Sequence, residues 1–537
     1  MTTNNPSAKP SSSPPPEQAV APPDSTLSRL ASPADANPAG NVHGGRLLSW
    51  AVECAWTAAC AHWLAANPPA GDPAGAIPPR RPRLAIARYE QMHFQLPSQI
   101  GGKITLSGKV IFTAEGSPCP SHAHFPAGGR HRLMLVLVTT RCVSYTNYVP
   151  SGSSNPDGPV TNTALIWVMD MDPESPGVPP MLTHPPGYET IFLIGSVLFT
   201  RWRDEVAGQW PFPESDSAVD AQEFVSSRPG LVSLPGPGPI ERYVHASDQK
   251  YGRKQEALEA QALLAQGPPT TMSEAELSEA FPGLTSLKPA DRVAAGLLPS
   301  RTRSETASSL SVLTVPSDAA PWEWPNRFDS ALLEVPAQGA ASGADALPPA
   351  VHAGPILYLM DTTAGIAAWR HCQAHIVTIS AQAIDFRRTV RVGEVLTSSA
   401  KIVFAGRRNI EIKVDVFSES PHAPTPSGPQ LAMTGYFRFV ALGPATASGK
   451  LAADVPEGTT AKPAPVTTYL AQPVNPLQLA CFRGEEDPAV VEEEWRLYVA
   501  ARARYLRSTS DRKFAQEMAA KKAAAAAAAT ADAPKQA

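Results

Sequence analysis

Two glycines before a long apolar stretch are the first residues whose arrangement could support chemistry. Gly44 and Gly45 precede the run from Leu47 to Trp63, in which Glu53 is the only Asp, Glu, Lys or Arg. Such a run predicts a helix that is buried on most faces. Glycine lets the backbone approach a ligand closely, and free N–H groups at a helix N-terminus favour a developing negative charge. The alternative interpretation is a core helix with a glycine-rich entry turn.

The same arrangement occurs a second time. The sequence Asn-Val-His-Gly-Gly at 41–45 is repeated as Ala-Val-His-Ala-Gly at 350–354, and an apolar stretch that contains Asp361 follows. Extended segments rich in β-branched residues come after both copies, at Arg83–Phe94 and Ile376–Phe386. Repetition on this scale predicts two homologous domains rather than a solenoid.

Length and composition limit the class of protein. A chain of 537 residues predicts two or three domains, and a net charge of −4 gives no sign of a nucleic-acid partner. The six cysteines form no Cys-x-x-Cys pair, which favours a reducing compartment and gives no indication of a zinc site. Residues 1–25 lack the apolar core of a signal peptide, and no apolar run predicts a membrane span. We therefore expect a cytoplasmic protein.

The 58 prolines are concentrated in a few stretches, which indicates globular domains with disordered insertions. Five parts are expected: a disordered tail at 1–24, a first domain with insertions at 25–172, an extra segment with a connecting helix and linker at 173–306, a second domain at 307–443, and a linker, C-terminal helix and Ala-rich tail at 444–537.

Each domain is expected to contain a short strand, a long helix and four further strands, which predicts the α+β class. The helix of the first domain is expected to end by Asn67, and that of the second domain to span Pro355–His371. Two charged segments outside the domains, Ile240–Gln266 and Glu485–Arg507, also have helical patterns. The expected strands are Thr26–Ala31, Leu84–Phe94, Ile104–Phe112, Leu133–Val143, Ala164–Met169, Ser308–Pro316, Ile376–Phe386, Leu396–Phe404, Ile410–Phe417 and Leu431–Leu442.

This order of elements, with Asn-Val-His-Gly-Gly before the helix, resembles the hotdog fold. The chain is similar to the cytosolic long-chain acyl-CoA thioesterases with two hotdog domains in tandem, a family that includes the brain-type acyl-CoA hydrolase. The matching segments are 35–45, Val312–Asp318, 359–372 and Ile376–Phe386. The resemblance covers both domain cores and omits the tails and the Pro/Gly-rich insertions. It implies two long central helices, each wrapped by an antiparallel sheet.

The resemblance implies hydrolysis of fatty acyl-CoA to a fatty acid and CoA at one site between the two domains. Asn41 stands at the family's Asn position and is expected to orient the water or the thioester carbonyl. Asp361 stands at the family's Asp position and is expected to be the base or nucleophile. The mirror-image site has Ala350 and Val52 at these positions, so we expect one active site and one inactive one.

Other residues are assigned supporting roles. The backbone N–H groups of Gly44 and Gly45 are the expected oxyanion donors. His43 and His352 occupy the same position in both copies, and a structural role is favoured for both. The resemblance also implies that Arg407, Arg408 and Asn409 bind the nucleotide end of CoA, with Arg387, Arg388 and Arg391 as weaker candidates.

The resemblance implies a homotrimer of tandem hotdogs that requires no metal and no redox cofactor. Two alternatives stay open. A catalytically silent acyl-CoA binding or sensing protein is compatible with Ala353 in the second motif and with the bulky Trp50. A hotdog hydratase would require an Asp–His pair, for which no convincing Asp-x-x-x-x-His pattern occurs. A serine hydrolase is disfavoured because the chain has no Gly-x-Ser-x-Gly.

Overall fold

The protein is described here by a computed structural model that places ten stretches of the chain. They are residues 25–66, 84–115, 132–143, 158–170, 253–319, 350–421, 428–444, 469–485, 487–506 and 508–509. The expected N-terminal tail, most of the insertions, the segment 173–240 and the Ala-rich C-terminus lie outside these residues, so the predictions for them stay untested.

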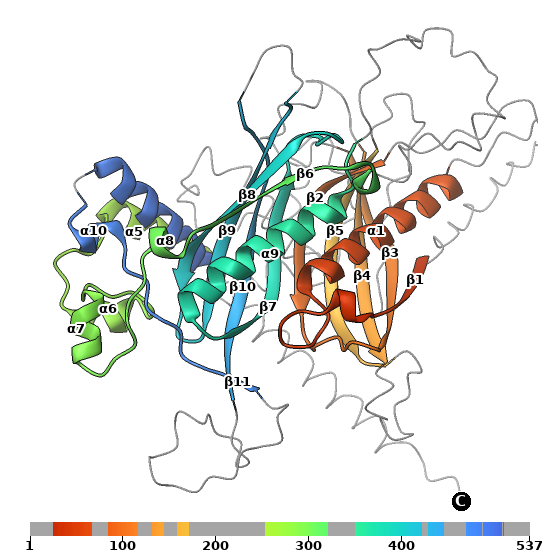
Figure 1. The fold of residues 1–537 in the computed structure, drawn as a ribbon. Coiled ribbons are helices and arrows are strands. Elements are labelled where there is room, and N and C mark those ends of the chain that lie inside the picture. The colour runs from red at the N-terminus through yellow and green to blue at the C-terminus, as the bar shows by residue number, and fades with distance from the viewer. Residues whose placement is uncertain are drawn as a thin grey trace, which may run out of the picture.

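The described residues of the first half form one long helix and five strands (Figure 1). Helix α1 buries a row of alanines, and these small side chains allow the sheet to pack closely against it. A Cβ atom on Gly108 of β3 would lie 3.0 Å from the carbonyl oxygen of Cys54 in α1, so glycine allows the closest approach of strand and helix at this contact. The elements are β1 (Ser25–Leu30), the 3-10 turn η1 (Pro33–Asp35), α1 (Gly44–Ala66), β2 (Leu84–Phe94), β3 (Lys103–Glu115), β4 (Arg132–Val143) and β5 (Val160–Asp170).

The second half repeats this order. In β9, Ile410, Ile412 and Val414 are fully buried on one face, as the alternating sequence predicts for a strand. The expected helices and strands of both halves are confirmed, with shifts of a few residues at their ends, and so is the α+β class. The elements are β6 (Ser308–Leu313), η3 (Pro316–Asp318), α9 (Ala353–Cys372), β7 (His375–Phe386), β8 (Val395–Ala405), β9 (Asn409–Glu419) and β10 (Gln430–Pro444).

The strands of both halves belong to one antiparallel sheet, in the order β1-β3-β4-β5-β2-β7-β10-β9-β8-β6. The halves join where β2 pairs with β7, with Gln91 opposite Gln382. Near this pairing, Arg88 Nη1 lies 3.1 Å from Asp385 Oδ1 across the junction, and both side chains are largely buried. Strand pairing and a buried ion pair therefore hold the halves together.

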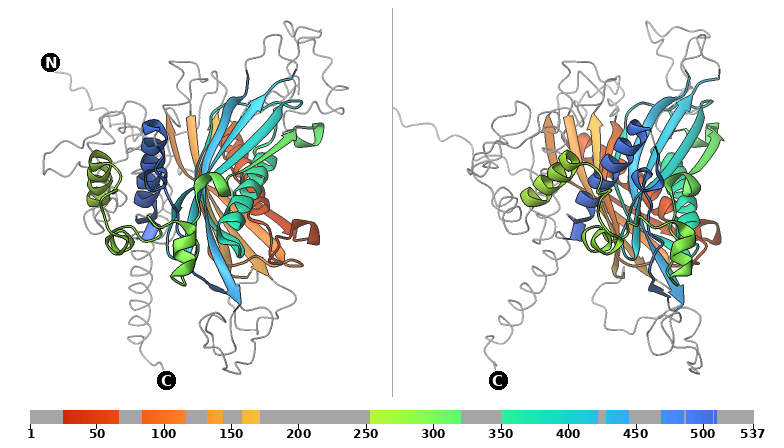
Figure 2. Two further views of the ribbon diagram at one scale, coloured as in Figure 1. Left: turned by 60° about the vertical axis from the view of Figure 1, so that its left-hand side comes forward. Right: turned by 90° about the vertical axis from the view of Figure 1, so that its left-hand side faces the viewer.

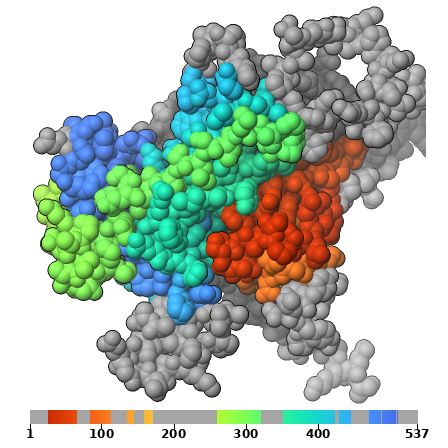
Figure 3. Space-filling model, viewed as in Figure 1, coloured from red at the N-terminus to blue at the C-terminus, as the bar shows by residue number. Residues whose placement is uncertain are grey.

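Helices α1 and α9 lie side by side on one face of the sheet (Figures 1 and 3). A Cβ atom on Gly45, in the first turn of α1, would lie 2.8 Å from the Cα of Tyr358 in the second turn of α9. A Cβ atom on Gly354, in the first turn of α9, would lie 2.2 Å from the hydroxyl oxygen of Ser49 in α1. The N-terminal turn of each helix is therefore packed against the other helix.

A layer of helices covers the opposite face of the second-half sheet (Figure 2). A helix over residues 488–506 carries Arg504, which pairs with the fully buried Glu411 of β9, and Trp495, whose indole N–H donates to the carbonyl of Leu263 in α5. The helical prediction is thus confirmed for residues 488–506 and for the part of Ile240–Gln266 that is described, since α5 spans Arg253–Gln266. None of the described helices combines the length and apolar character that a membrane span requires.

The linker that the sequence predicts before the second domain contains three short helices within residues 267–306. This stretch contains α6 (Glu274–Ala280), α7 (Pro289–Ala294) and α8 (Arg303–Thr306), and it buries Leu277 and Phe281. Helices this short show no usable hydrophobic period, although Ser273 and Thr302 form capping boxes that the sequence contains. The expected linker after β10 likewise contains β11 (Tyr469–Ala471), and α10 (Ala480–Arg483) follows.

Candidate active site

Asp361 lies in the third turn of α9, and its side chain is only 2% exposed. Its Oδ2 accepts a hydrogen bond of 2.7 Å from the backbone N–H of Gly45 in α1. Its Oδ1 accepts one of 2.9 Å from the hydroxyl of Thr378 in β7. Both bonds, and the positive end of the α1 dipole, compensate for the burial of a carboxylate. A single carboxylate therefore links the helix of the first half to the helix and sheet of the second.

The glycine pair is required for this contact. A Cβ atom on Gly44 would lie 2.8 Å from Asp361 Oδ2 and 3.0 Å from the hydroxyl oxygen of Thr378. A Cβ atom on Gly45 would lie 3.3 Å from the Cβ of Asp361, in addition to its contact with Tyr358. The two glycines therefore allow the start of α1 to approach the carboxylate directly, as the close-approach interpretation of the sequence predicts.

The structure corrects the expectation that both glycine N–H groups are available to an oxyanion. The Gly45 N–H already donates to the Asp361 carboxylate. The Gly44 N–H makes no hydrogen bond with any other described residue, and Gly44 lines the neighbouring pocket. Only Gly44 is left as a backbone donor, because a carboxylate at the helix N-terminus already occupies the Gly45 N–H.

His43 lies beside the carboxylate. Its Nδ1 accepts a hydrogen bond of 3.1 Å from the Gly45 N–H and lies 3.2 Å from Asp361 Oδ2. The imidazole packs against Tyr358 with ring centroids 4.8 Å apart, and the Arg46 guanidinium lies over the same tyrosine ring. These contacts fit a structural role for His43, which holds the first turn of α1 against α9.

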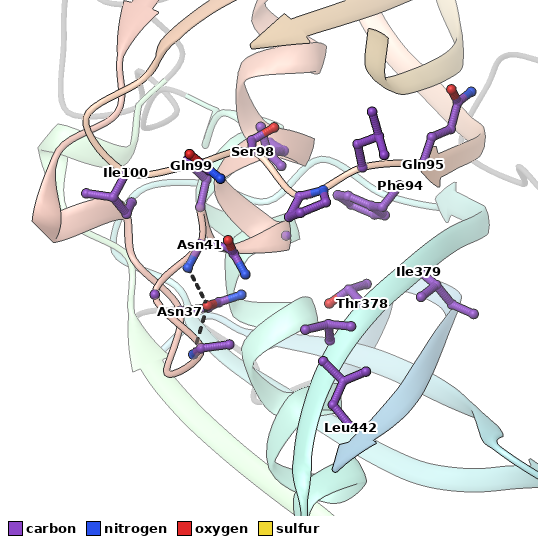
Figure 4. Close-up of a pocket in the computed structure, with 18 of the residues that line it drawn as sticks. Asn37, Asn41, Phe94, Gln95, Ser98, Gln99, Ile100, Thr378, Ile379 and Leu442 are labelled. Atoms are coloured by element: carbon purple, nitrogen blue, oxygen red, sulfur yellow. Dashed lines mark hydrogen bonds between the residues drawn. The ribbon is translucent and has the colours of Figure 1, made fainter. Parts of the chain in front are cut away.

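A pocket of about 700 Å³ opens next to Gly44 (Figure 4). Asn37 and Asn41 lie on one side of it, and Thr378 lies across from them. Asp361 is not among the lining residues; it sits directly behind Gly44 and Thr378. The lining residues are Asn37, Ala39, Gly40, Asn41, Val42, Gly44, Leu47, 94–100, Val377, Thr378, Ile379, Leu442 and Tyr469.

The loop before α1 contributes two asparagines to the pocket. Asn41 lines it as expected, and its backbone forms a bridge with Gln99. Asn37 lines it as well, and its Oδ1 accepts hydrogen bonds of 3.0 Å from the backbone N–H groups of Ala39 and Asn41. This Asx-type turn fixes the Asn37 carboxamide, whose nitrogen points toward the side of the pocket where Thr378 lies (Figure 4).

Sequence reasoning missed Asn37 and Thr378. The signal for Asn37 is the sequence Asn-Pro-Ala-Gly at 37–40, a turn pattern in which Gly40 adopts a φ of +79°. For Thr378 the sequence holds no comparable signal, because it lies within an ordinary β-branched strand. Only the packing of β7 beneath α9 brings its hydroxyl to Asp361.

The mirror position of the site lacks the same chemistry. Val52 is fully buried at the place in α1 that Asp361 occupies in α9. The Gly354 N–H donates to its own His352 Nδ1 at 3.0 Å, and the side chain it faces in α1 is Ser49. Glu53 pairs with Arg29 instead of pointing inward. The described residues therefore place no carboxylate opposite the start of α9.

The three residues expected to bind CoA lie at the turn between β8 and β9. Arg407 and Arg408 are exposed, and none of the three lines the pocket. The turn is still close to it, because Asn409 pairs with Val440 of β10, which in turn pairs with Val377 of β7. Two strand spacings, roughly 10 Å, therefore separate Asn409 from a residue of the pocket wall. The weaker candidates Arg387, Arg388 and Arg391 do not line the pocket either.

Among the described residues, no three His, Cys, Asp or Glu side chains gather in a way that could hold a metal ion. The groups that the structure places at or behind the pocket are a buried carboxylate, amide and hydroxyl donors, and the Gly44 N–H group.

Part of the chain is similar to known proteins. Residues 349–425 match the family described as Thioesterase superfamily. The chain is 38% identical over 92 residues to the cytosolic acyl coenzyme A thioester hydrolase of Homo sapiens, which covers 17% of this chain and 24% of that protein. It is 34% identical over 89 residues to an uncharacterized acyl-CoA thioester hydrolase of Zymomonas mobilis, which covers 17% of this chain and 58% of that protein. The chain thus matches about a quarter of the human relative's length.

A solved acyl-CoA hydrolase from Staphylococcus aureus aligns with 42% of this chain and 98% of its own, at 19% identity and a TM-score of 0.27, a likeness too weak to support an argument. The matched segment 349–425 contains α9 with Asp361, β7 with Thr378, and the Arg407–Arg408 turn. The similarity to the thioesterase superfamily therefore lies in the second half of the chain and includes the carboxylate of the candidate site.

Proposed function

We propose that this chain hydrolyses fatty acyl-CoA to free fatty acid and CoA at a single site between two tandem hotdog domains. The observation that carries the proposal is the hydrogen bond from the Gly45 N–H of the first half to the Asp361 carboxylate of the second, directly behind a pocket of about 700 Å³. The thioesterase-superfamily match includes Asp361, and the relatives named above are acyl-CoA thioester hydrolases. The repeated order of elements and the shared sheet support two hotdog units.

Thioester hydrolysis needs a base or nucleophile and donors for the oxyanion. Asp361 is the base or nucleophile in this proposal, and its Oδ2 lies directly behind Gly44 of the pocket wall, where only a glycine leaves it uncovered. The Gly44 N–H and the amides of Asn41 and Asn37 are the donors to the carbonyl. Asn37 is the better fixed of the two amides, because two backbone N–H groups hold its Oδ1. A donor held in place before the reaction stabilises the transition state at no cost in reorganisation.

The second site is inactive in this proposal. It has Val52 where the carboxylate belongs and Ala350 where the motif asparagine belongs. The active site in this proposal depends on both halves. Asn41 and Gly44 come from the first half, and Asp361 and Thr378 come from the second.

We also propose the assembly, location and cofactor requirement that follow from the family resemblance. The chain is expected to form a homotrimer, to reside in the cytoplasm like relatives whose names call them cytosolic, and to need no metal or redox cofactor. Light scattering at micromolar concentration measures the assembly. Turnover after dialysis against a chelator measures the metal requirement.

A release assay for the free thiol of CoA, run over acyl chains of several lengths, tests the function. Release that depends on Asp361 supports the hydrolase. Tight binding of acyl-CoA without release would identify the silent binding protein instead, and addition of water to an enoyl-CoA would identify a hydratase. The Asp361→Asn variant is the control for contaminating thioesterases, because it keeps the size and shape of the side chain.

A further inference from the structure

The end of the pocket formed by Leu442 and Tyr469 differs from the rest of its wall. Tyr469 begins β11, which pairs with the last residues of β10 so that Tyr469 lies opposite Pro444. Tyr469 is 39% exposed, and its ring lies edge-on to His375, with the ring centroids 5.5 Å apart. An exposed aromatic ring therefore stands at the solvent side of the pocket, where it is supplied by a segment outside the repeated domain elements.

Cationic side chains adjoin this end. Strand β9 pairs with β10 as far as Asn409 opposite Val440, and β11 takes over the same edge of β10 from Leu442. Arg407 and Arg408 are therefore neighbours of β11 along one strand edge. Backbone hydrogen bonds reinforce this: the Val474 N–H, just after β11, donates to the Arg407 carbonyl at 3.1 Å, and the Ala441 N–H lies 3.4 Å from the Arg408 carbonyl.

From this juxtaposition we propose that Tyr469 is a substrate-binding residue that stacks on the adenine of CoA. This inference rests on the proposed function. An aromatic ring open to solvent, with the exposed residues Arg407 and Arg408 further along the same strand edge, matches a nucleotide, which offers a flat base next to phosphates. An acyl chain would instead favour the enclosed apolar wall around Leu47 and Phe94. The C-terminal extension that begins with β11 thereby becomes part of the substrate site.

Two matched substrates test the proposal. Palmitoyl-CoA carries the nucleotide, and palmitoyl-pantetheine has the same thioester without it. We expect Tyr469→Ala to raise KM for palmitoyl-CoA about tenfold, the range of base–aromatic stacking, with kcat unchanged. KM for palmitoyl-pantetheine should not change. Tyr469→Phe keeps the ring and should behave as the wild type, and Trp369→Ala removes an exposed aromatic side chain of α9 that does not line the pocket.

The outcomes separate this inference from the proposed function. An equal rise in KM for both substrates would place Tyr469 against the acyl or pantetheine portion and overturn the inference, as would no change for either. Calorimetric titration with free CoA gives a second readout that needs no turnover. If the wild type hydrolyses neither substrate yet binds CoA about tenfold more tightly than Tyr469→Ala does, the hydrolase proposal fails and the stacking role stands. If the wild type neither hydrolyses acyl-CoA nor binds CoA, both fail.

Discussion

The backbone N–H of Gly45, in the first half of the chain, lies 2.7 Å from the carboxylate of Asp361, in the second half. These residues are 316 positions apart in the sequence. Their contact places the positive end of α1 against the acidic group of the thioesterase-superfamily segment. The predictions below test whether this contact is the centre of the site.

Replacement of Asp361 by Asn should lower kcat by at least ~10², because the amide keeps the shape of the side chain but cannot act as base or nucleophile. Steady-state hydrolysis of palmitoyl-CoA measures this. Asp415→Asn is the matched control, since Asp415 is a carboxylate in β9 that pairs with Lys413 and does not line the pocket. Normal turnover by a folded Asp361→Asn variant would remove Asp361 from the mechanism.

A methyl group at Gly44 should disrupt the site. Its Cβ would lie 2.8 Å from Asp361 Oδ2 and 3.0 Å from the Thr378 hydroxyl, so either α1 or the carboxylate must shift and their close approach is lost. We expect Gly44→Ala to lower kcat at least tenfold and to lower the thermal midpoint, because overpacking typically costs about 1–3 kcal/mol.

Gly365→Ala provides the comparison for Gly44→Ala. Gly365 also lies in a helix, but its Cβ would meet only Ile376 at an ordinary 3.8 Å. The Gly365→Ala variant should keep full activity and have a higher thermal midpoint than the wild type, since alanine in a helix interior is favoured over glycine by up to about 1 kcal/mol. Equal behaviour of the two variants would show that the approach of α1 to Asp361 is not tight.

The two asparagines of the loop before α1 can be separated by isosteric changes. Asn37→Asp keeps the Oδ1 that accepts hydrogen bonds from the backbone N–H groups of Ala39 and Asn41, so the turn is preserved. The substitution removes the side-chain N–H donor, so the hydrogen bond to the oxyanion is lost. We expect a kcat loss of about 10² for Asn37→Asp and a smaller one for Asn41→Asp, because a preorganised donor contributes more. The reverse order would return the main role to Asn41.

A buried histidine predicts loss of stability in mild acid. Burial lowers the pKa of His371 from 6.5 to about 4, and its Nε2 contacts the Asn475 carbonyl. The unfolded chain protonates His371 near pH 6.5, and the folded chain protonates it only near pH 4. The free energy of unfolding is therefore highest above pH 6.5 and falls as the pH drops toward 4. At pH 5 this histidine lowers the free energy of unfolding by about 2 kcal/mol.

Thermal unfolding at pH 7 and pH 5 measures this effect. His371→Gln removes the titrating ring at this position, and the amide can still donate to the Asn475 carbonyl. The drop in midpoint between the two pH values should therefore be smaller in His371→Gln than in the wild type. An identical drop in both proteins would mean that His371 does not titrate in this range.

The sequence by itself determined the local elements. Alternation of apolar residues in β9, the long apolar runs of α1 and α9, and the β-branched segments β2 and β7 are properties of neighbouring residues, so they can be identified without a structure. The repeated motif at 41–45 and 350–354 also indicated where the two helices begin and that glycine matters there. The short helices α6 to α8 and strand β11 were missed, because elements of three to seven residues are too short for a hydrophobic period.

The tertiary structure decided how the site is assembled. The pairing of β2 with β7 and the packing of α1 on α9 bring Asp361, Gly45 and Thr378 into hydrogen-bonding distance. They also show that the Gly45 N–H is already engaged, that Asn37 joins Asn41 in the pocket, and that Tyr469 forms one end of it. No local pattern specifies these contacts, because they arise between segments far apart in the chain that meet only when both halves bury their apolar faces in one sheet and one helix pair.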